Sequence, residues 1–131
     1  MRDEAERWFS GALWDLDTAK ILFEKKRYNA AVFYAHQAAE KAVKALLYSI
    51  NEAPWGHSIR SLLHRFFKSQ SIDIDENIMS LARELDLHYI PSRYPNAHPS
   101  GTPHEAYDER VSYNALRAAE KIIEFVRGLL T

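Results

Sequence analysis

Apolar and polar residues alternate along this chain with the spacing of α-helices. Between Arg2 and about Lys25, apolar residues recur every three or four positions, which is the pattern of a helix with one buried face. The stretch from Tyr28 to Asn51 is apolar over most of its circumference and contains neither Gly nor Pro. Because a surface helix normally has a narrower apolar face, this stretch predicts a central helix with neighbours on several sides.

One polar stripe interrupts the apolar surface of the predicted central helix. At about 100° per residue, its members fall within an arc of roughly 140°. They are His36, Gln37, Glu40, Lys41 and Lys44. Two interpretations stay open: a solvated face with a Glu40–Lys44 pair, which the pattern alone favours, or one wall of a polar cleft. His36 and Glu40 lie one turn apart, so a hydrogen bond between them would fix the imidazole tautomer.

Three more helical segments follow the central one. They are a short helix that His57 or Ser58 opens and that reaches Phe67, a helix from Asp73 to about Tyr89, and a last helix that ends near Leu130. The last helix has two rival starts, a capping box at Thr102–Glu105 and an N-cap at Asp108. The sequence therefore predicts an all-α fold. We expect an antiparallel up-and-down helical bundle of four main helices plus one short helix, in one domain over residues 1–131.

A proline-rich segment from Ile90 to Ala106 separates the last two predicted helices. Its four prolines exclude a continuous helix or a central strand. Long irregular loops in compact domains are commonly functional or disordered. This one carries side chains that bind ligands, which are Arg93, Tyr94, Asn96, His98 and His104. Because prolines lower the entropic cost of fixing such groups, we expect a functional loop.

Composition excludes several classes of function. The formal net charge is −1, so the strongly basic footprint of non-specific nucleic-acid binding is absent and any RNA contact must be local. The chain has no cysteine, no apolar run long enough to span a membrane and no signal-peptide pattern, which predicts a cytoplasmic protein without a membrane contact. Phosphate-binding glycine motifs are absent, and we predict no cofactor.

The histidines and tryptophans need separate interpretation, because none of them belongs to a recognised metal-binding motif. His88, His98 and His104 do not have the spacing of common metal ligands, so we predict no metal site. The three tryptophans are interpreted as packing residues, with Trp14 partly exposed at an interface. His57, in the Gly-His-Ser triplet, is expected to cap the short helix and anchor its loop.

Three motifs resemble one known family. They are FYAHQAAEKAVKALL, GHSIRSLL and HYIPSRYPNA, the last placed before a final amphipathic helix, and together they cover nearly the whole chain. In this combination they closely resemble the HEPN domain family. The resemblance implies an antiparallel α-helical bundle that forms a homodimer. It also implies pairing with a minimal nucleotidyltransferase, in modules similar to toxin–antitoxin systems. Some members of the family bind nucleotides, and others are metal-independent endoribonucleases.

The ribonuclease branch of the family carries an Arg, then four to six intervening residues, then a His. Arg93 and His98 fit this spacing. A His titrates near neutrality and can move the proton of a ribose 2′-hydroxyl, while an Arg offers a planar fork to the phosphate. In ribonuclease relatives the pair lies on a helix, whereas Tyr94 and Pro95 follow the Arg here. The segment is more similar to the nucleotide-binding or partner branch.

Two hypotheses of function follow. The favoured one is a non-catalytic helical module that dimerises, binds a nucleotide or RNA, and partners a minimal nucleotidyltransferase. The alternative is a metal-independent endoribonuclease, a HEPN toxin with Arg93 and His98 as its catalytic pair. The ligand-binding residues that we predict are Gln37, Glu40, Lys41, Lys44, Arg93, Tyr94 and Asn96. The polar stripe of the central helix is expected to lie near the Arg93–His98 loop.

Overall fold

The computed structural model describes residues 2–130 and contains six α-helices and one short 3₁₀ helix over that range. The α-helices are α1 (Arg2–Glu24), α2 (Tyr28–Ser49), α3 (Ile59–Ser69), α4 (Glu76–Asp86), α5 (Pro103–Ala106) and α6 (Glu109–Leu129). The 3₁₀ helix, η1, spans Pro95–Ala97. No strand occurs in the described residues, so the prediction of an all-α helical bundle is confirmed.

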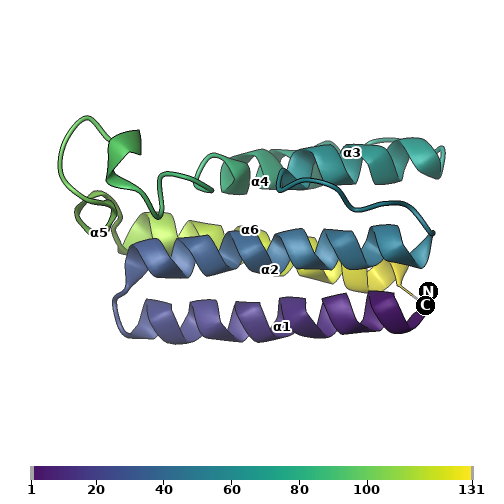
Figure 1. The fold of residues 1–131 in the computed structure, drawn as a ribbon, viewed down its shortest axis with the longest axis horizontal. Helices are drawn as coiled ribbons and strands as arrows, with labels where there is room; N and C mark the ends of the chain where they lie inside the picture. Colours follow the sequence, from purple (N-terminus) through teal and green to yellow (C-terminus); the bar gives the residue numbers. More distant parts are fainter. Residues whose placement is uncertain (1, 131) are drawn as a thin grey trace.

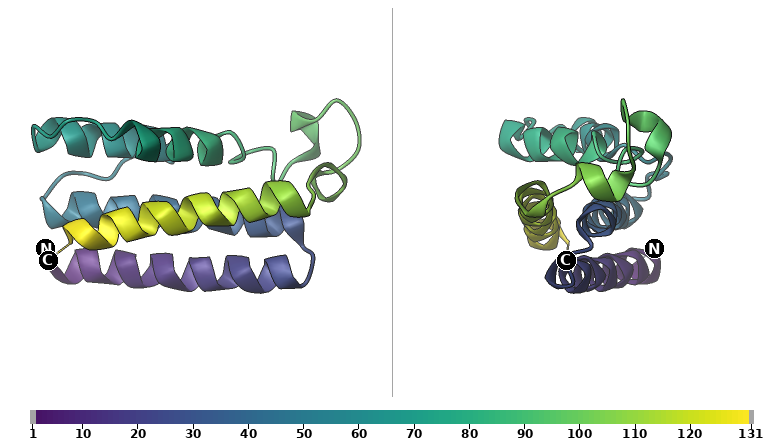
Figure 2. Two further views of the ribbon diagram at one scale, coloured as in Figure 1. Left: turned by 180° about the vertical axis from the view of Figure 1, so that it is seen from behind. Right: turned by 90° about the vertical axis from the view of Figure 1, so that its left-hand side faces the viewer.

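The three long helices pack together, and the two medium ones, α3 and α4, form a layer over α2 and α6 on the side away from α1 (Figures 1 and 2). Helices α1 and α2 form an antiparallel hairpin, whereas α2 and α6 run in the same direction (Figure 1). Helices α3 and α4 carry the chain out and back over α2 before η1 and α5 at one end of the bundle. The first turn of α1 and the last turn of α6 lie at the opposite end.

Helix α2 is the centre of the core, as its sequence predicts. Its alanines at the contacts with neighbouring helices are completely buried, and among them are Ala35, Ala39 and Ala42. Small side chains allow the backbones of α1 and α6 to approach α2 closely. Leu46 and Leu47 fill the remaining space, with at most 1% of either exposed. These buried contacts with the five other α-helices explain why the apolar face of α2 is so wide.

Three helices end on a residue in the left-handed conformation. Lys26, Asn51 and Ser71 have φ angles of 62°, 60° and 53°. In each case the following amide donates to the carbonyl five residues before it; for example, Arg27 N lies 2.8 Å from Leu22 O. This Schellman arrangement satisfies carbonyls at the helix end and reverses the chain within a few residues. It explains the short connection between α1 and α2.

Both predicted bounds of α4 need correction. Helix α4 begins after Asp75, whose carboxylate accepts a hydrogen bond from Ile78 N, and Asp73 therefore does not cap it. The same helix ends at Asp86, before the expected Tyr89. The predicted loop from residue 90 to 106 also contains ordered helical turns, η1 and α5.

Both rival starts of the last helix are used. The capping box of Thr102 and Glu105 forms, but it opens only the four residues of α5. Asp108 then caps α6, with its carboxylate 3.0 Å from Val111 N. Tyr107, between the two helices, has extended backbone angles and a buried side chain, which breaks what the sequence suggests as one helix.

The hydropathy of the helices bears on whether any of them could cross a membrane. In the part of the chain that the structure describes, no helix combines the length and the apolar character required to cross a lipid bilayer.

Candidate functional site

The polar stripe of α2 is mostly buried, which corrects the solvated face that the pattern alone favours. His36 is fully buried, and only 4% of Glu40 and 9% of Lys44 are exposed. The cover comes from the start of α3, the end of α4 and the segments beside them, which contact the stripe directly. Because charges buried in this way must be paired, the stripe is part of an internal polar network.

Asp86, at the end of α4, holds the start of α3 in place. Its carboxylate accepts hydrogen bonds from the amides of Ile59 and Arg60, at 2.9 and 3.1 Å, and from the Ser58 hydroxyl at 2.9 Å. The His36 Nε2–H donates to the same carboxylate at 3.1 Å. Burial opposes ionisation of Asp86, but these hydrogen bonds together outweigh it and lower the pKa of the carboxyl below its ordinary value.

Glu40 is the second acidic centre of the network. Its Oε2 lies 2.9 Å from Lys44 Nζ and 3.1 Å from His57 Nδ1. His36 Nδ1 lies 3.7 Å from Glu40 Oε1, too far for the expected hydrogen bond, and 3.4 Å from Gln37 Oε1. The His36 tautomer is therefore fixed by Asp86, whose carboxylate can only accept at Nε2. His57 bonds to Glu40, and the expected cap of α3 comes from the neighbouring Ser58.

Arg93 lies in an aromatic cradle, formed by Phe33 of α2 and by Tyr89 and Tyr94 from its own segment. The guanidinium carbon is 4.6, 4.5 and 4.8 Å from the centres of these three rings. Its Nε donates to the Tyr89 carbonyl at 3.1 Å, which fixes the orientation of the fork. The ring of His57 stacks on Tyr89 with centroids 5.1 Å apart. The network around Glu40 therefore continues through His57 and Tyr89 to Arg93.

No carboxylate neutralises Arg93. Among the described residues, every ion pair is formed by other side chains. One terminal nitrogen donates a long hydrogen bond of 3.5 Å to the Tyr94 hydroxyl, and the half-buried guanidinium keeps its charge and its other terminal donors for a partner. Such a cradle is suited to a phosphate or to a planar anion such as a carboxylate.

The other predicted ligand-binding residues divide into two groups. Gln37 and Lys44 belong to the network around Glu40, and Tyr94, 47% exposed, forms the outer wall of the cradle. Lys41 instead turns toward α1, where its Nζ lies 2.7 Å from an Asp15 carboxylate oxygen. Asn96 lies exposed on η1. The structure brings the stripe and the Arg93 loop together, but it does so without Lys41.

His98 is engaged by the backbone of its own loop. Its Nε2–H donates to the Pro91 carbonyl at 2.7 Å, and its ring meets the edge of Tyr107. Arg93 and His98 thus have different partners, and the described contacts do not join the two side chains. His98 closes the loop that carries Arg93.

His88 and Tyr107 connect the end of α4 to the start of α6. The Tyr107 hydroxyl lies 2.9 Å from His88 Nδ1. Burial raises the pKa of Tyr107 to about 12 and, with the nearby His36, lowers the pKa of His88. A neutral imidazole accepting from a neutral phenol fits both directions. In the described residues no group of three or more His, Cys, Asp or Glu side chains is arranged to hold a metal ion.

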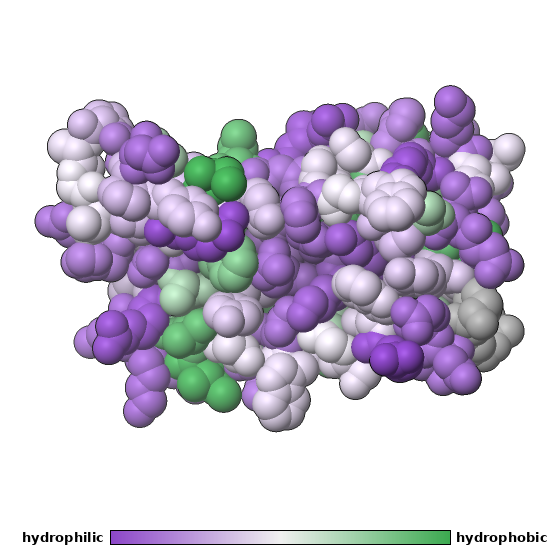
Figure 3. Space-filling model, viewed as in Figure 1, coloured by the Kyte–Doolittle hydropathy of each residue, from purple (hydrophilic) through white to green (hydrophobic). Residues whose placement is uncertain are grey.

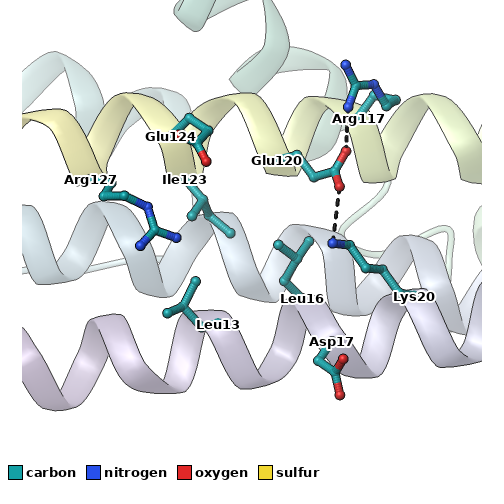
Figure 4. A pocket seen from close by; sticks show the side chains of 9 residues that line it. All are labelled: Leu13, Leu16, Asp17, Lys20, Arg117, Glu120, Ile123, Glu124 and Arg127. Carbon is teal, nitrogen blue, oxygen red and sulfur yellow. Dashed lines mark hydrogen bonds and ion pairs between the residues drawn. The ribbon is translucent and has the colours of Figure 1, made fainter.

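A separate groove of about 430 Å³ lies between α1 and α6 (Figure 4). Leu13, Leu16 and Ile123 line its apolar part. On its rim, Glu120 accepts from Arg117 at 2.7 Å and from Lys20 at 3.2 Å. Burial opposes ionisation of Glu120, but the two cations together lower the pKa of its carboxyl. Because these charges neutralise one another, this groove offers less for an anionic ligand than the cradle does.

Sequence reasoning did not single out Phe33, Tyr89 or Asp86. Aromatic residues in an amphipathic pattern look like core, so Phe33 and Tyr89 gave no separate signal. Asp86 did give one, because an acid in the last turn of a helix is disfavoured by the macrodipole. The interpretation of Trp55 as a packing residue is wrong, because its side chain is 77% exposed. Trp14, which was expected to be partly exposed, is 74% exposed.

Comparison with known proteins identifies relatives of similar length. The model of the HEPN domain family matches residues 5–129. The crystal structure of TT1696 from Thermus thermophilus is 37% identical and has a TM-score of 0.91, with 95% of this chain and 97% of that chain covered. The archaeal HEPN homologue ST0689 is 34% identical, with a TM-score of 0.83 and 98% of each chain covered. "Putative toxin MJ1304" of Methanocaldococcus jannaschii is 26% identical over 123 residues, covering 88% of this chain and 81% of that protein.

Proposed function

This chain belongs to the HEPN domain family, and on that premise we propose that it is a toxin–antitoxin-like HEPN protein that binds a nucleotide or RNA without cleaving it. The fold and the toxin described among its relatives support the general assignment. The Arg93 cradle supports the ligand class, because nucleotides combine a phosphate with a planar base.

The single observation that carries this proposal is the half-buried, unneutralised Arg93 between three aromatic rings. An arginine buried only to stabilise the fold would normally have a carboxylate partner. A ligand phosphate would supply the missing partner, and the exposed ring of Tyr94 would offer a surface for the base.

The contacts of His98 support a non-catalytic role. Its Nε2–H is used by the Pro91 carbonyl, and a proton shuttle would have to break that bond or use Nδ1. We assign to His98 the task of closing the Arg93 loop.

We test this assignment by calorimetry with AMP and ATP. Arg93→Ala should weaken binding about tenfold or more, because it removes both the charge and the fork. Arg127→Ala is the matched control, since Arg127 also stacks on an aromatic ring, 5.3 Å from the centre of Phe9, but on another surface. His98→Ala should leave the affinity close to that of wild type. Wild-type affinity in Arg93→Ala would show that nucleotides do not use the cradle.

The spacing of Arg93 and His98, with the toxin described among the relatives, favours metal-independent endoribonuclease activity as the second candidate. It requires His98 to reach a bound phosphate or ribose. Under our proposal the protein leaves a mixed RNA substrate uncut over hours in EDTA. Cleavage that both Arg93→Ala and His98→Ala abolish, in variants with a wild-type circular dichroism spectrum, would replace our proposal with the ribonuclease.

We further propose a homodimer and a minimal nucleotidyltransferase partner, both implied by the family. Trp14 and Ile21 support an interface on α1, because they are 74% and 50% exposed and lie seven residues apart on one helix. For the partner, we expect a stable complex on gel filtration after co-expression with a minimal nucleotidyltransferase of the same genome. Separate elution of the two proteins at micromolar concentration would count against that partner.

A further inference from the structure

Helix α3 carries a stripe of cationic and titratable side chains on its outer face. Arg60, His64 and Lys68 are exposed and lie four residues apart, so they point to the same side with a rise of about 6 Å between neighbours. No acidic residue occurs within α3. The net charge of the whole chain, −1, conceals this local concentration of positive charge.

The charges of this α3 stripe are not neutralised within the chain. Across residues 2–130, the ion pairs leave out Arg60 and Lys68, and also Arg83 of α4. Arg60 and Arg83 line one groove of about 570 Å³, together with Ser80, Glu84, Asp86 and Leu87. Glu84 and Asp86 lie in the same groove and balance these two arginines, so the groove itself carries no excess of positive charge. The excess lies on α3, whose own residues include no acid.

The α3 stripe begins where the Arg93 cradle ends. The amide of Arg60 bonds to Asp86, three residues before Tyr89. His57, just before α3, stacks on Tyr89, and Arg93 lies against the same ring. In the view of Figure 3, hydrophilic residues cover much of α3 and the adjoining middle of the face. The cradle and the α3 stripe therefore adjoin at His57 and Tyr89.

We infer that this surface binds a single-stranded polynucleotide, RNA or DNA, with a base at the Arg93 cradle and phosphates along the α3 stripe. Proteins that bind single strands combine a row of cations that follows the backbone with aromatic rings on which bases stack. The cradle supplies the rings, and Arg60, Arg83 and Lys68 supply the row. This inference rests on the proposed function and extends it, because a mononucleotide would reach only the cradle.

Fluorescence anisotropy with a labelled RNA of about ten nucleotides tests the inference, with a DNA of the same sequence and AMP as companion ligands. The variant is Arg60→Ala/Lys68→Ala, and the matched control is Arg110→Ala/Lys121→Ala, which removes two exposed cations from α6. The variant should bind the oligonucleotide about tenfold more weakly and show a salt dependence reduced by roughly 1.4 in the logarithmic slope, since each lost phosphate contact removes about 0.7. Its affinity for AMP and its circular dichroism spectrum should not change.

The outcomes separate this inference from the proposed function. Unchanged oligonucleotide affinity in Arg60→Ala/Lys68→Ala would overturn the inference, and so would equal losses in the α6 control. Unchanged AMP affinity in Arg93→Ala would instead overturn the assignment of the cradle. Tighter binding of RNA than of DNA, lost in the α3 variant, would identify the ribose 2′-hydroxyl as a contact and RNA as the ligand.

Discussion

At the scale of single residues, Asp86 connects three parts of the molecule. Its carboxylate accepts from the first amides of α3, beside the Ser58 N-cap, and from His36 of α2, and Asp86 is itself the last residue of α4. The residue is placed against the macrodipole of its own helix, and its hydrogen bonds with α3 offset that cost. The candidate site depends on it, because the start of α3 carries His57 and Arg60.

We expect Asp86→Ala to lower the free energy of unfolding by about 2–4 kcal/mol, since it removes the acceptor of the first amides of α3 and leaves the buried His36 without its acceptor. Urea denaturation measures this change. Asp73→Ala is the control, because Asp73 is exposed and does not cap α4, so it should stay within about 0.5 kcal/mol of wild type. Equal effects of the two substitutions would show that the hydrogen bonds of Asp86 do not stabilise the fold as we expect.

A second residue-scale prediction concerns His88. Because burial lowers its pKa in the folded state, the unfolded chain binds a proton first as the pH falls through the ordinary His range near 6.5. Stability should therefore decrease from about pH 7 to about pH 5.5, and it should do so less in His88→Gln, which keeps an acceptor for Tyr107. Urea midpoints at the two pH values measure this, with the exposed His64→Gln as control. A wild-type pH dependence in His88→Gln would contradict the prediction.

The residues of the candidate site were only partly predictable. Arg93 and Tyr94 stood out because a proline-rich loop carried them, and loops with ligand-type side chains are commonly functional. The burial of Glu40 and Lys44 could not be predicted, because it depends on how α3 and α4 cover α2. Helical periodicity reports which side of one helix is polar, but not which other helix lies against that side.

At the scale of elements, α2 determines the packing of its neighbours. Ala39 is fully buried, and 1% of Leu46 is exposed. We expect Ala39→Leu to destabilise the fold by roughly 1–3 kcal/mol through overpacking and Leu46→Ala by roughly 2–5 kcal/mol through a cavity. Thermal or urea unfolding measures both. Leu129→Ala, at a position that is 39% exposed, should cost clearly less than Leu46→Ala. Wild-type stability in both core variants would be inconsistent with a central α2.

The helices themselves were predictable where one signal decided the boundary. The first two helices end within two residues of their predicted limits, because a basic turn and an Asn mark those ends. The start of α4 was missed because Asp73 and Asp75 both suit an N-cap, and packing decided between them. The separation of α5 from α6 depends on Tyr107, whose burial is a tertiary effect.

At the scale of the whole molecule, the exposed tryptophans bear on assembly. The apolar surface of α2 is covered within one chain, so an interface between two chains must use other residues. Trp14 and Ile21 offer such a surface on α1. Large exposed apolar patches are uncommon on monomers, and burying them would be favourable.

We therefore expect light scattering to give the mass of a dimer at micromolar concentration and Trp14→Glu to give that of a monomer. Trp55→Glu, at a similarly exposed tryptophan in the loop before α3, serves as the control and should leave the dimer intact. A monomer mass for the wild-type protein would exclude the proposed homodimer.

The parallel arrangement of α2 and α6 has a consequence for the time course of folding. Helices α1 and α2 are joined by a short turn and can pair at once, whereas α6 reaches α2 only after the second layer and the proline-rich segment (Figure 1). The hairpin can therefore form during synthesis, before α6 exists. Leu16→Ala, in that hairpin, should slow refolding, and Ile122→Val, on α6, should chiefly accelerate unfolding in stopped-flow experiments. The opposite assignment of the two effects would place α6 in the folding nucleus.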